Sequence, residues 1–457
     1  MDTPFGHAEY FDQTTLHPLG LAALLVLGSI LLLIQRRWAM LPIIVMACFI
    51  APGQRIAIFG LNFDLIRMLV LIGFFRVIVR SELVALRWKP MDTIVVAWAV
   101  TATILYTVLY QTPEALIYQL GAKIFDGAFA YFVLRCLVQT WDDVRRTMLV
   151  FVIVSIPVSI AFLFEQATAR NVFSIFGGVP EITVMRNDRL RCQGAFAHPI
   201  LAGVFWAAIQ PMILGLWFAG ARYKPLALVG LFCSTVIVLT CASSTPLSGM
   251  ILGGVAWAFW PLRARMQQVR WGLAALLVVL HFAMKNPVWF LFAKVDFVGG
   301  STGWHRFFLM DEFIKQIGAW WAVGMKELLH EDLFDITNQY VLEGINGGLL
   351  SMMLFIWIIA RAFSGVGRLW RVEQRSRANQ VMAWAMGVTM FVHVTSFFAV
   401  SYFGQINILF TMHLAMIASL APGLAPAPAL VPAAPRRAVA PTPPGIPAPR
   451  PNVRRPA

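Results

Sequence analysis

Long apolar stretches separated by short polar segments run along almost the whole chain. A transmembrane helix needs about 20 largely apolar residues, with a range of about 17–25. We therefore expect membrane-spanning helices over 17–35, 38–51, 64–80, 92–110, 115–138, 147–166, 199–219, 225–242, 246–262, 271–284, 341–363, 380–400 and 404–421. The pattern predicts an all-α fold, a polytopic membrane helix bundle of about 12–13 spans formed by residues 1–421.

The composition supports the same class. Of the 457 residues, 59% are hydrophobic and only 13% are charged, whereas soluble domains average about 45–50% apolar and about 25% charged residues. The net charge of +14 is spread over short loops and the C-terminal tail. Such a distribution fits topology signals rather than a nucleic-acid-binding face, where basic residues cluster. We therefore exclude a nucleic-acid partner and expect membrane lipids around the bundle.

The basic residues also predict the orientation, because cytoplasmic loops carry an excess of lysine and arginine. Taking alternate loops as cytoplasmic collects most of the basic residues on one side. The acidic N-terminus and two long polar loops, 167–198 and 285–340, then lie on the outer face. From Pro422 the chain becomes rich in alanine, proline and arginine, so we expect residues 422–457 to form a disordered cytoplasmic tail.

Basic residues in the two outer loops run against this topology bias. They include Arg170, Arg186, Arg189, Arg191, Arg306, Lys315 and Lys326. Ordinary solvation of a loop is one explanation. The other is an anion site, because the planar guanidinium of arginine matches the geometry of phosphate oxygens.

Apolar residues recur at three- and four-residue spacing between Trp304 and Trp321, within the second outer loop. This spacing predicts an amphipathic helix. Its aromatic face suits the level of the lipid headgroups, with Arg306 near the lipid phosphates.

One predicted span carries charged residues. Lys123 and Asp126 lie one turn apart within 115–138, which indicates a helix that faces a polar interior. A local ion pair between the two side chains would explain their entry into the bundle equally well.

The segment Arg189 to Pro199 leads directly into a predicted span. Proline suits the first turn of a helix, where its missing N–H costs little. His198 then lies at a helix start on the outer face, close in sequence to Arg189 and Arg191. A histidine in this position is more often a capping or packing residue, but its basic neighbours leave a role in the site open.

Two further polar stretches border predicted spans. The sequence from Ala242 to Pro246 forms a short serine-rich outer turn, which is also what a tight interhelical connection needs. The second stretch, Asp335 to Tyr340, precedes a span that begins with several glycines. Glycines in this position permit the close approach of helices.

Three features together resemble the O-antigen ligase and polymerase superfamily. They are Arg191 with Gly194, Phe196 and His198-Pro199, the serine-rich turn, and the long outer loop that ends in Asn338-Gln339-Tyr340 before a glycine-rich span. The resemblance covers roughly residues 60–420. It implies a multi-pass enzyme of the bacterial inner membrane that acts on undecaprenyl-diphosphate-linked oligosaccharides. A chain-length regulator or another polysaccharide-assembly protein is a candidate partner.

The resemblance also implies roles for particular residues. Arg191 and Arg306 would bind the diphosphate, and the end of the long loop would present the proton acceptor. Thr337 stands where the family often has histidine, so Asp335, His330 or His198 would have to accept the proton. The candidate substrate-binding residues are Arg189, Arg191, Arg306, Lys326, Asn338 and Tyr340.

We expect no cofactor and no metal. The five cysteines show no metal-ligand spacing and are expected to be small apolar packing residues. The predicted activity is the polymerisation of lipid-linked glycan units, with O-antigen ligation as one alternative. A transporter or flippase for a lipid-linked solute is the other, and it predicts charged residues near the middle of several spans.

Overall fold

The computed structural model describes residues 14–58, 61–294, 303–327, 329–333 and 335–422. A helix occupies each of the predicted apolar ranges. Within the described residues, six helical segments are long and apolar enough to cross a membrane, and the helices Pro18–Leu33 and Gln405–Leu420 are shorter but apolar. The chain is therefore an all-α, polytopic membrane protein, as the sequence predicts. The predicted tail 422–457 lies, apart from Pro422, outside the described residues.

The helices follow one another along the chain, with short connections except in the two long outer loops. The first group is α1 (Pro18–Leu33), α2 (Met40–Phe49), α3 (Leu65–Val79), α4 (Pro90–Tyr110), α5 (Pro113–Gln119), the π-helix η4 (Leu120–Phe129) and α6 (Ala130–Leu137). The second group is α7 (Trp141–Thr168), α8 (Pro199–Trp217), α9 (Lys224–Thr240), α10 (Ser244–Ala258) and α11 (Met266–Ala283). The last is α12 (Leu291–Lys294), α13 (Gly303–Lys315), α14 (Ile317–Trp320), α15 (Gln339–Val372), α16 (Arg377–Ser396) and α17 (Gln405–Leu420).

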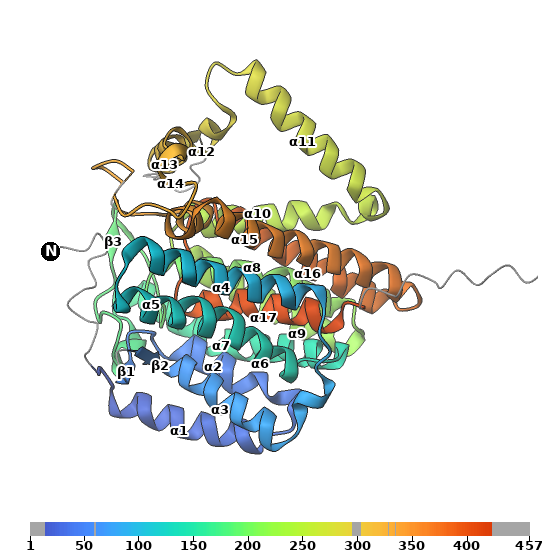
Figure 1. Cartoon of the computed structure of the whole chain (residues 1–457). Helices are drawn as coiled ribbons and strands as arrows, with labels where there is room; N and C mark the ends of the chain where they lie inside the picture. The colour runs from blue at the N-terminus through green and yellow to red at the C-terminus, as the bar shows by residue number, and fades with distance from the viewer. Residues whose placement is uncertain (1–13, 59–60, 295–302, 328, 334, 423–457) are drawn as a thin grey trace, which may run out of the picture. The chain divides into compact units, whose positions relative to one another are not determined.

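The loops predicted on the outer side meet at one end of the bundle, which we call the loop end. The side chain of Gln54, after α2, donates a hydrogen bond to the carbonyl of Phe176 in the 167–198 loop. Gln405 donates from its Nε2 to the carbonyl oxygen of Ala195 at 2.7 Å. Two antiparallel hairpins, β1 (Arg55–Ile58) with β2 (Leu61–Asp64) and β3 (Met185–Arg186) with β4 (Arg189–Leu190), lie at this end (Figure 1).

The loops predicted on the cytoplasmic side meet at the opposite end. Arg36, after α1, pairs with Asp143 at the start of α7 with an N–O distance of 2.6 Å. The Lys89 ammonium donates hydrogen bonds to the carbonyls of Ala418, Ser419 and Ala421 at the C-terminal end of α17. This division of contacts agrees with the alternation of loops that the basic residues predict.

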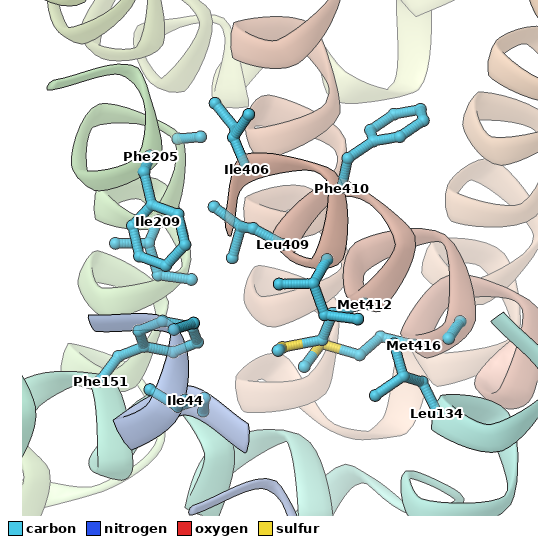
Figure 2. Packing of buried hydrophobic residues seen from close by; sticks show 14 of the residues in the cluster. Ile44, Leu134, Phe151, Phe205, Ile209, Ile406, Leu409, Phe410, Met412 and Met416 are labelled. Carbon is cyan, nitrogen blue, oxygen red and sulfur yellow. The ribbon is translucent and has the colours of Figure 1, made fainter. Parts of the chain in front are cut away.

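The apolar core lies between α2, α6, α7, α8 and α17. Figure 2 shows Ile44, Phe151 and Phe205 close to Leu409 and Met412 of α17. Nearly every residue of α17 is buried, and α8 is buried along most of its length, so these two helices form the centre of the bundle. All five cysteines are buried and free, which confirms their expected packing role.

In contrast, α11 has no buried residue in the described structure. In Figure 1 it diverges from the neighbouring helices. Its apolar side chains, such as Phe282 at 82% exposure, require an apolar surrounding, which a membrane supplies.

Between Trp304 and Trp321 the predicted amphipathic helix is divided at Gln316 into α13 and α14. Trp304 and Trp321 are 64% and 56% exposed, as the membrane-facing interpretation requires. A second apolar face, formed by Leu309, Phe313 and Trp320, is buried. Arg306 is on the buried side at 7% exposure, so it does not share the exposed aromatic face of Trp304.

Candidate functional site

Helix α13 places Arg306 against the serine-rich turn between α9 and α10. The Arg306 Nη2 donates a hydrogen bond to Thr245 Oγ1 at 2.8 Å, and both side chains are buried. The turn brings Ser243 and Ser244 to the start of α10, where they are also buried. The long outer loop and the serine-rich turn, which the sequence treats as separate features, therefore form one polar surface at the loop end.

The 167–198 loop contacts the end of α9, directly before the same turn. The backbone N–H of Cys192 donates to the carbonyl of Thr240, the last residue of α9, at 3.1 Å. The preceding residue, Arg191, is 7% exposed and its N–H donates to the carbonyl of Val184. Arg306 thus contacts the start of α10, and the residue that follows Arg191 contacts the end of α9, so the two outer loops approach the two ends of the same turn.

A buried carboxylate fixes this part of the loop. Glu165, near the end of α7, is 1% exposed. Its Oε1 accepts hydrogen bonds from the Gln193 N–H at 3.0 Å and from Thr183 Oγ1 at 3.1 Å, and its Oε2 accepts from the Gly194 N–H at 3.0 Å. Charge-assisted hydrogen bonds of this kind are stronger than neutral ones, so Glu165 sets the position of the backbone beside Arg191.

Gly194 is required for this conformation. Its φ is +56°, in the left-handed region, and a Cβ at this position would lie 2.4 Å from Cε2 of Phe162. Both the backbone and the packing therefore select glycine.

Positively charged side chains surround Arg191 and His198. Burial, and then the nearby positive charge of Arg186, lower the pKa of Arg191. His198 caps α8, and its Nδ1 accepts a hydrogen bond from the Ile200 N–H at 3.1 Å. Burial, followed by the charges of Arg191 and Arg186, lowers the pKa of His198 to about 4. The histidine is therefore neutral near pH 7, and it is a weak base, since an effective general base has a pKa near the working pH.

The end of the long loop packs on α13. His305 contacts the Asp335 carbonyl through its Nε2 at 3.0 Å, and the Phe308 ring lies edge-on to the His330 ring at 5.0 Å. The side chains of Asp335 and His330 are exposed. Of the three predicted proton acceptors, these two lie on the long loop beside α13, whereas His198 lies at the start of α8.

Asn338 and Tyr340 have well-defined structural contacts. Asn338 is 1% exposed and caps α15, because its Oδ1 accepts from the N–H groups of Tyr340 and Val341. The Tyr340 hydroxyl donates to the Val394 carbonyl at 3.1 Å. These contacts hold the start of α15 against α16, so the two side chains serve packing in the structure, whatever further role they have.

The remaining candidate cations are more exposed. Lys326 lies over the ring of Tyr110 at 5.7 Å, at the end of α4. Arg189 is an exposed residue of β4, paired in the hairpin register with Arg186. Neither residue is buried beside the serine-rich turn as Arg191 and Arg306 are.

A cavity of about 510 Å³ opens among the helices at the loop end. Its charged lining comes from several helices. Arg67 of α3 pairs with Asp126 of η4 through two hydrogen bonds of 2.7 and 2.6 Å, and Lys123 of η4 pairs with Glu343 of α15 at 2.5 Å. The sequence alternative of a local pair between Lys123 and Asp126 is therefore wrong, because each side chain has a partner on a different helix.

Two irregular helices form walls of this cavity. The π-helix η4 carries Lys123 and Asp126, and π-helical turns occur frequently at functional sites. Helix α15 is interrupted at Gly347 and Gly348, where the backbone is not helical. A Cβ on Gly348, at φ +63°, would lie 2.5 Å from the Ala322 carbonyl oxygen. The predicted role of these glycines, close approach of neighbouring segments, agrees with this contact.

Glu165, Arg67 and Glu343 are the site residues that the sequence did not single out as functional. Glu165 ends a long apolar helix, and Glu343 follows the Asn338-Gln339-Tyr340 stretch by three residues. The only available signal was a carboxylate inside or beside an apolar span, which indicates a functional or paired group.

Comparison with known proteins gives no match to any protein-family model and no significant match to a curated protein.

Proposed function

We propose that the chain is a glycosyltransferase of the bacterial inner membrane that transfers a glycan from an undecaprenyl-diphosphate donor to a sugar hydroxyl at the outer face. The observation that carries this proposal is that Arg306 bonds to Thr245 at the start of α10, while Cys192, the residue after Arg191, bonds to Thr240 at the end of α9. Two buried guanidinium groups from separate loops provide planar donors suited to a diphosphate. The proposal places the loop end at the outer leaflet.

In this reaction the acceptor hydroxyl attacks the anomeric carbon of the donor, and the bond to the diphosphate breaks. Negative charge develops on the leaving diphosphate, and Arg191 and Arg306 stabilise it. A preorganised donor at a site of developing charge contributes about 2.7–4 kcal/mol. The proton of the acceptor hydroxyl passes to a base, and Asp335, whose exposed side chain lies on the long loop beside α13, is the candidate for this role.

Polymerisation of glycan units is favoured over O-antigen ligation. Thr337 occupies the place where the resembled family often has histidine, and a threonine hydroxyl does not act as a base near neutral pH. The ligase alternative therefore requires another proton acceptor, whereas the polymerase alternative is less tied to that position.

A transporter is the second candidate, and the cavity is the observation that favours it. Arg67, Lys123, Asp126 and Glu343 bring charges from three helical segments into the bundle. Ionisable residues within spans commonly mark substrate or ion pathways. Each of these side chains has a partner of opposite charge, however, which also fits a static wall.

The substitutions Arg191→Ala and Arg306→Ala, tested in the source organism, separate these functions. The transferase proposal expects loss of surface polymer while lipid-linked units still reach the outer leaflet. Units stranded in the inner leaflet would instead support transport. Arg265→Ala, at an exposed position in the predicted cytoplasmic connection between α10 and α11, is the control and should leave polymer unchanged. Normal polymer in both arginine variants would overturn the transferase proposal.

A further inference from the structure

The cavity among α3, η4, α4, α15 and α17 differs in the charge of its lining from the cationic residues at the serine-rich turn. Its volume of about 510 Å³ lies within the range of about 300–1,000 Å³ that is usual for ligand pockets. It extends from Gly53 and Phe403 at the loop end to Val95 and Trp98 within the bundle. A ligand of several rings could therefore enter from the loop end.

The charges that line the cavity cancel. Its charged lining consists of three cations, Arg55, Arg67 and Lys123, and three carboxylates, Asp64, Asp126 and Glu343. The formal net charge is zero. Such a lining selects neither an anion such as a diphosphate nor a metal cation, since either would need an excess of the opposite charge.

The carboxylate of Glu343 shows that these charged groups already have hydrogen-bond partners within the protein. Its Oε1 accepts from Lys123 Nζ at 2.5 Å and from Gln339 Nε2 at 2.9 Å. Its Oε2 accepts from Trp98 Nε1 at 3.1 Å and from Ser351 Oγ at 3.4 Å. The carboxylate therefore has little capacity left for a cationic ligand, and Lys123 is held in place by its partner and by the Trp98 ring at 4.7 Å.

Two amide oxygens in the cavity wall are different. Gln119, at the end of α5, is 1% exposed, and Asn346 lies just before the interruption of α15. Among the described residues, Gln119 Oε1 and Asn346 Oδ1 are buried and accept no hydrogen bond. Both side chains line the cavity. Buried acceptors of this kind are costly unless a donor satisfies them.

A ligand that satisfies these oxygens must supply hydrogen-bond donors without net charge. Hydroxyl groups are neutral donors that also accept, and a sugar ring presents several of them on an apolar ring framework. The cavity offers apolar surface for that framework from Phe125, Phe397 and Phe403.

We infer that this cavity binds an uncharged, hydroxyl-rich glycan segment, and that the amides of Gln119 and Asn346, whose oxygens have almost no accessible surface in the structure, turn toward it to accept hydrogen bonds. Its identification as the acceptor chain rests on the proposed function, whereas the binding itself does not. The diphosphate of the donor would then lie at the serine-rich turn, and the sugar units of the acceptor would occupy the neutral cavity.

The test uses the full chain purified in detergent. The probes are neutral oligosaccharides released by mild acid from the surface polysaccharide of the source organism, and inorganic pyrophosphate as the anionic comparison. Binding is measured by calorimetric titration and by the shift in thermal unfolding temperature. We expect wild type to bind the oligosaccharides, and Gln119→Leu and Asn346→Leu each to weaken this binding by about tenfold or more, which corresponds to about 1.4 kcal/mol.

Leucine is close in size to both amides and leaves no unmet acceptor, so neither substitution should lower the unfolding temperature of the unliganded protein. Gln267→Leu, at an exposed position of α11, is the matched control and should bind as wild type does. Absence of oligosaccharide binding to wild type, unchanged binding by both leucine variants, or pyrophosphate binding that these variants abolish would each overturn the inference.

The two proposals fail in distinguishable ways. Arg306→Ala should lose polymer synthesis while the purified variant still binds oligosaccharide in the cavity. If Arg191→Ala and Arg306→Ala keep normal polymer, the transferase proposal fails while the cavity can still bind glycan. If wild type makes polymer but binds no oligosaccharide, the cavity inference fails alone.

Discussion

Arg306 and Thr245, 61 positions apart in sequence, are joined by a buried hydrogen bond of 2.8 Å between Nη2 and Oγ1. This contact makes the position of the long loop depend on the α9–α10 turn. A change in the turn therefore alters the position of the Arg306 guanidinium, and a movement of α13 alters the position of the turn.

Thr245→Val should weaken the attachment of α13 to the bundle. Valine keeps the shape of threonine but removes the hydroxyl that accepts from Arg306. A hydrogen bond to a charged group contributes about 1.5–3 kcal/mol, and we expect a loss of stability of that size. Thermal unfolding in detergent measures it. Thr245→Ser, which keeps the hydroxyl, is the control, and equal stability of the valine variant and wild type would contradict the prediction.

Glu165→Gln should loosen the backbone beside Arg191. In glutamine an amide NH2 group, which donates and does not accept, replaces one of the two carboxylate oxygens, so the N–H of either Gln193 or Gly194 loses its acceptor. We expect a loss of about 1–3 kcal/mol together with faster proteolysis within 169–198. Limited proteolysis followed by mass spectrometry locates the cleavage. Cleavage at the wild-type rate would show that this carboxylate does not hold the loop.

The regular part of this fold follows from its sequence, because a membrane requires long apolar helices and these are visible as apolar runs. The positions of the loops are set differently. Arg306 and Thr245 meet through the packing of α13, and Glu165 binds backbone N–H groups of Gln193 and Gly194, which no side-chain pattern records. Lys123 and Asp126 show the limit most clearly, since residues one turn apart in sequence find their partners on α15 and α3. The presence of a polar interior was predictable, but the pairing within it was not.

Gly194→Ala should be more destabilising than Gly177→Ala. Both glycines have positive φ, +56° and +78°, and Gly177 has ψ 168°, so alanine is strained at either position by about 1–3 kcal/mol. At Gly177 the new Cβ would meet its nearest neighbour at 3.4 Å, an ordinary contact, whereas at Gly194 it would lie 2.4 Å from the Phe162 ring. The overlap adds about 1–3 kcal/mol. Equal unfolding temperatures of the two variants would refute this assignment.

Gly348→Ala should disturb the interruption of α15. Alanine would be strained at φ +63° and would lie 2.5 Å from the Ala322 carbonyl oxygen, so the segment that follows α14 has to move. We expect a loss of at least about 1–2 kcal/mol from the backbone strain alone. Gly367→Ala, in the same helix with open space around it, should be neutral or slightly stabilising. The comparison of their unfolding temperatures is the measurement.

His198 gives the protein a predictable acid sensitivity. Burial beside Arg191 and Arg186 lowers its pKa from 6.5 to about 4, so the unfolded chain takes up a proton at higher pH than the folded chain does. The stability contributed by the neutral imidazole is present above pH 6.5 and is lost as the pH falls towards 4. One such group changes the free energy of unfolding by at most about 1.4 kcal/mol per pH unit in this window. His198→Asn keeps a side chain that can cap α8 but does not titrate, so the difference in stability between wild type and variant should shrink as the pH is lowered from 7 to 4.5. A difference that is constant across this range would show that His198 titrates normally.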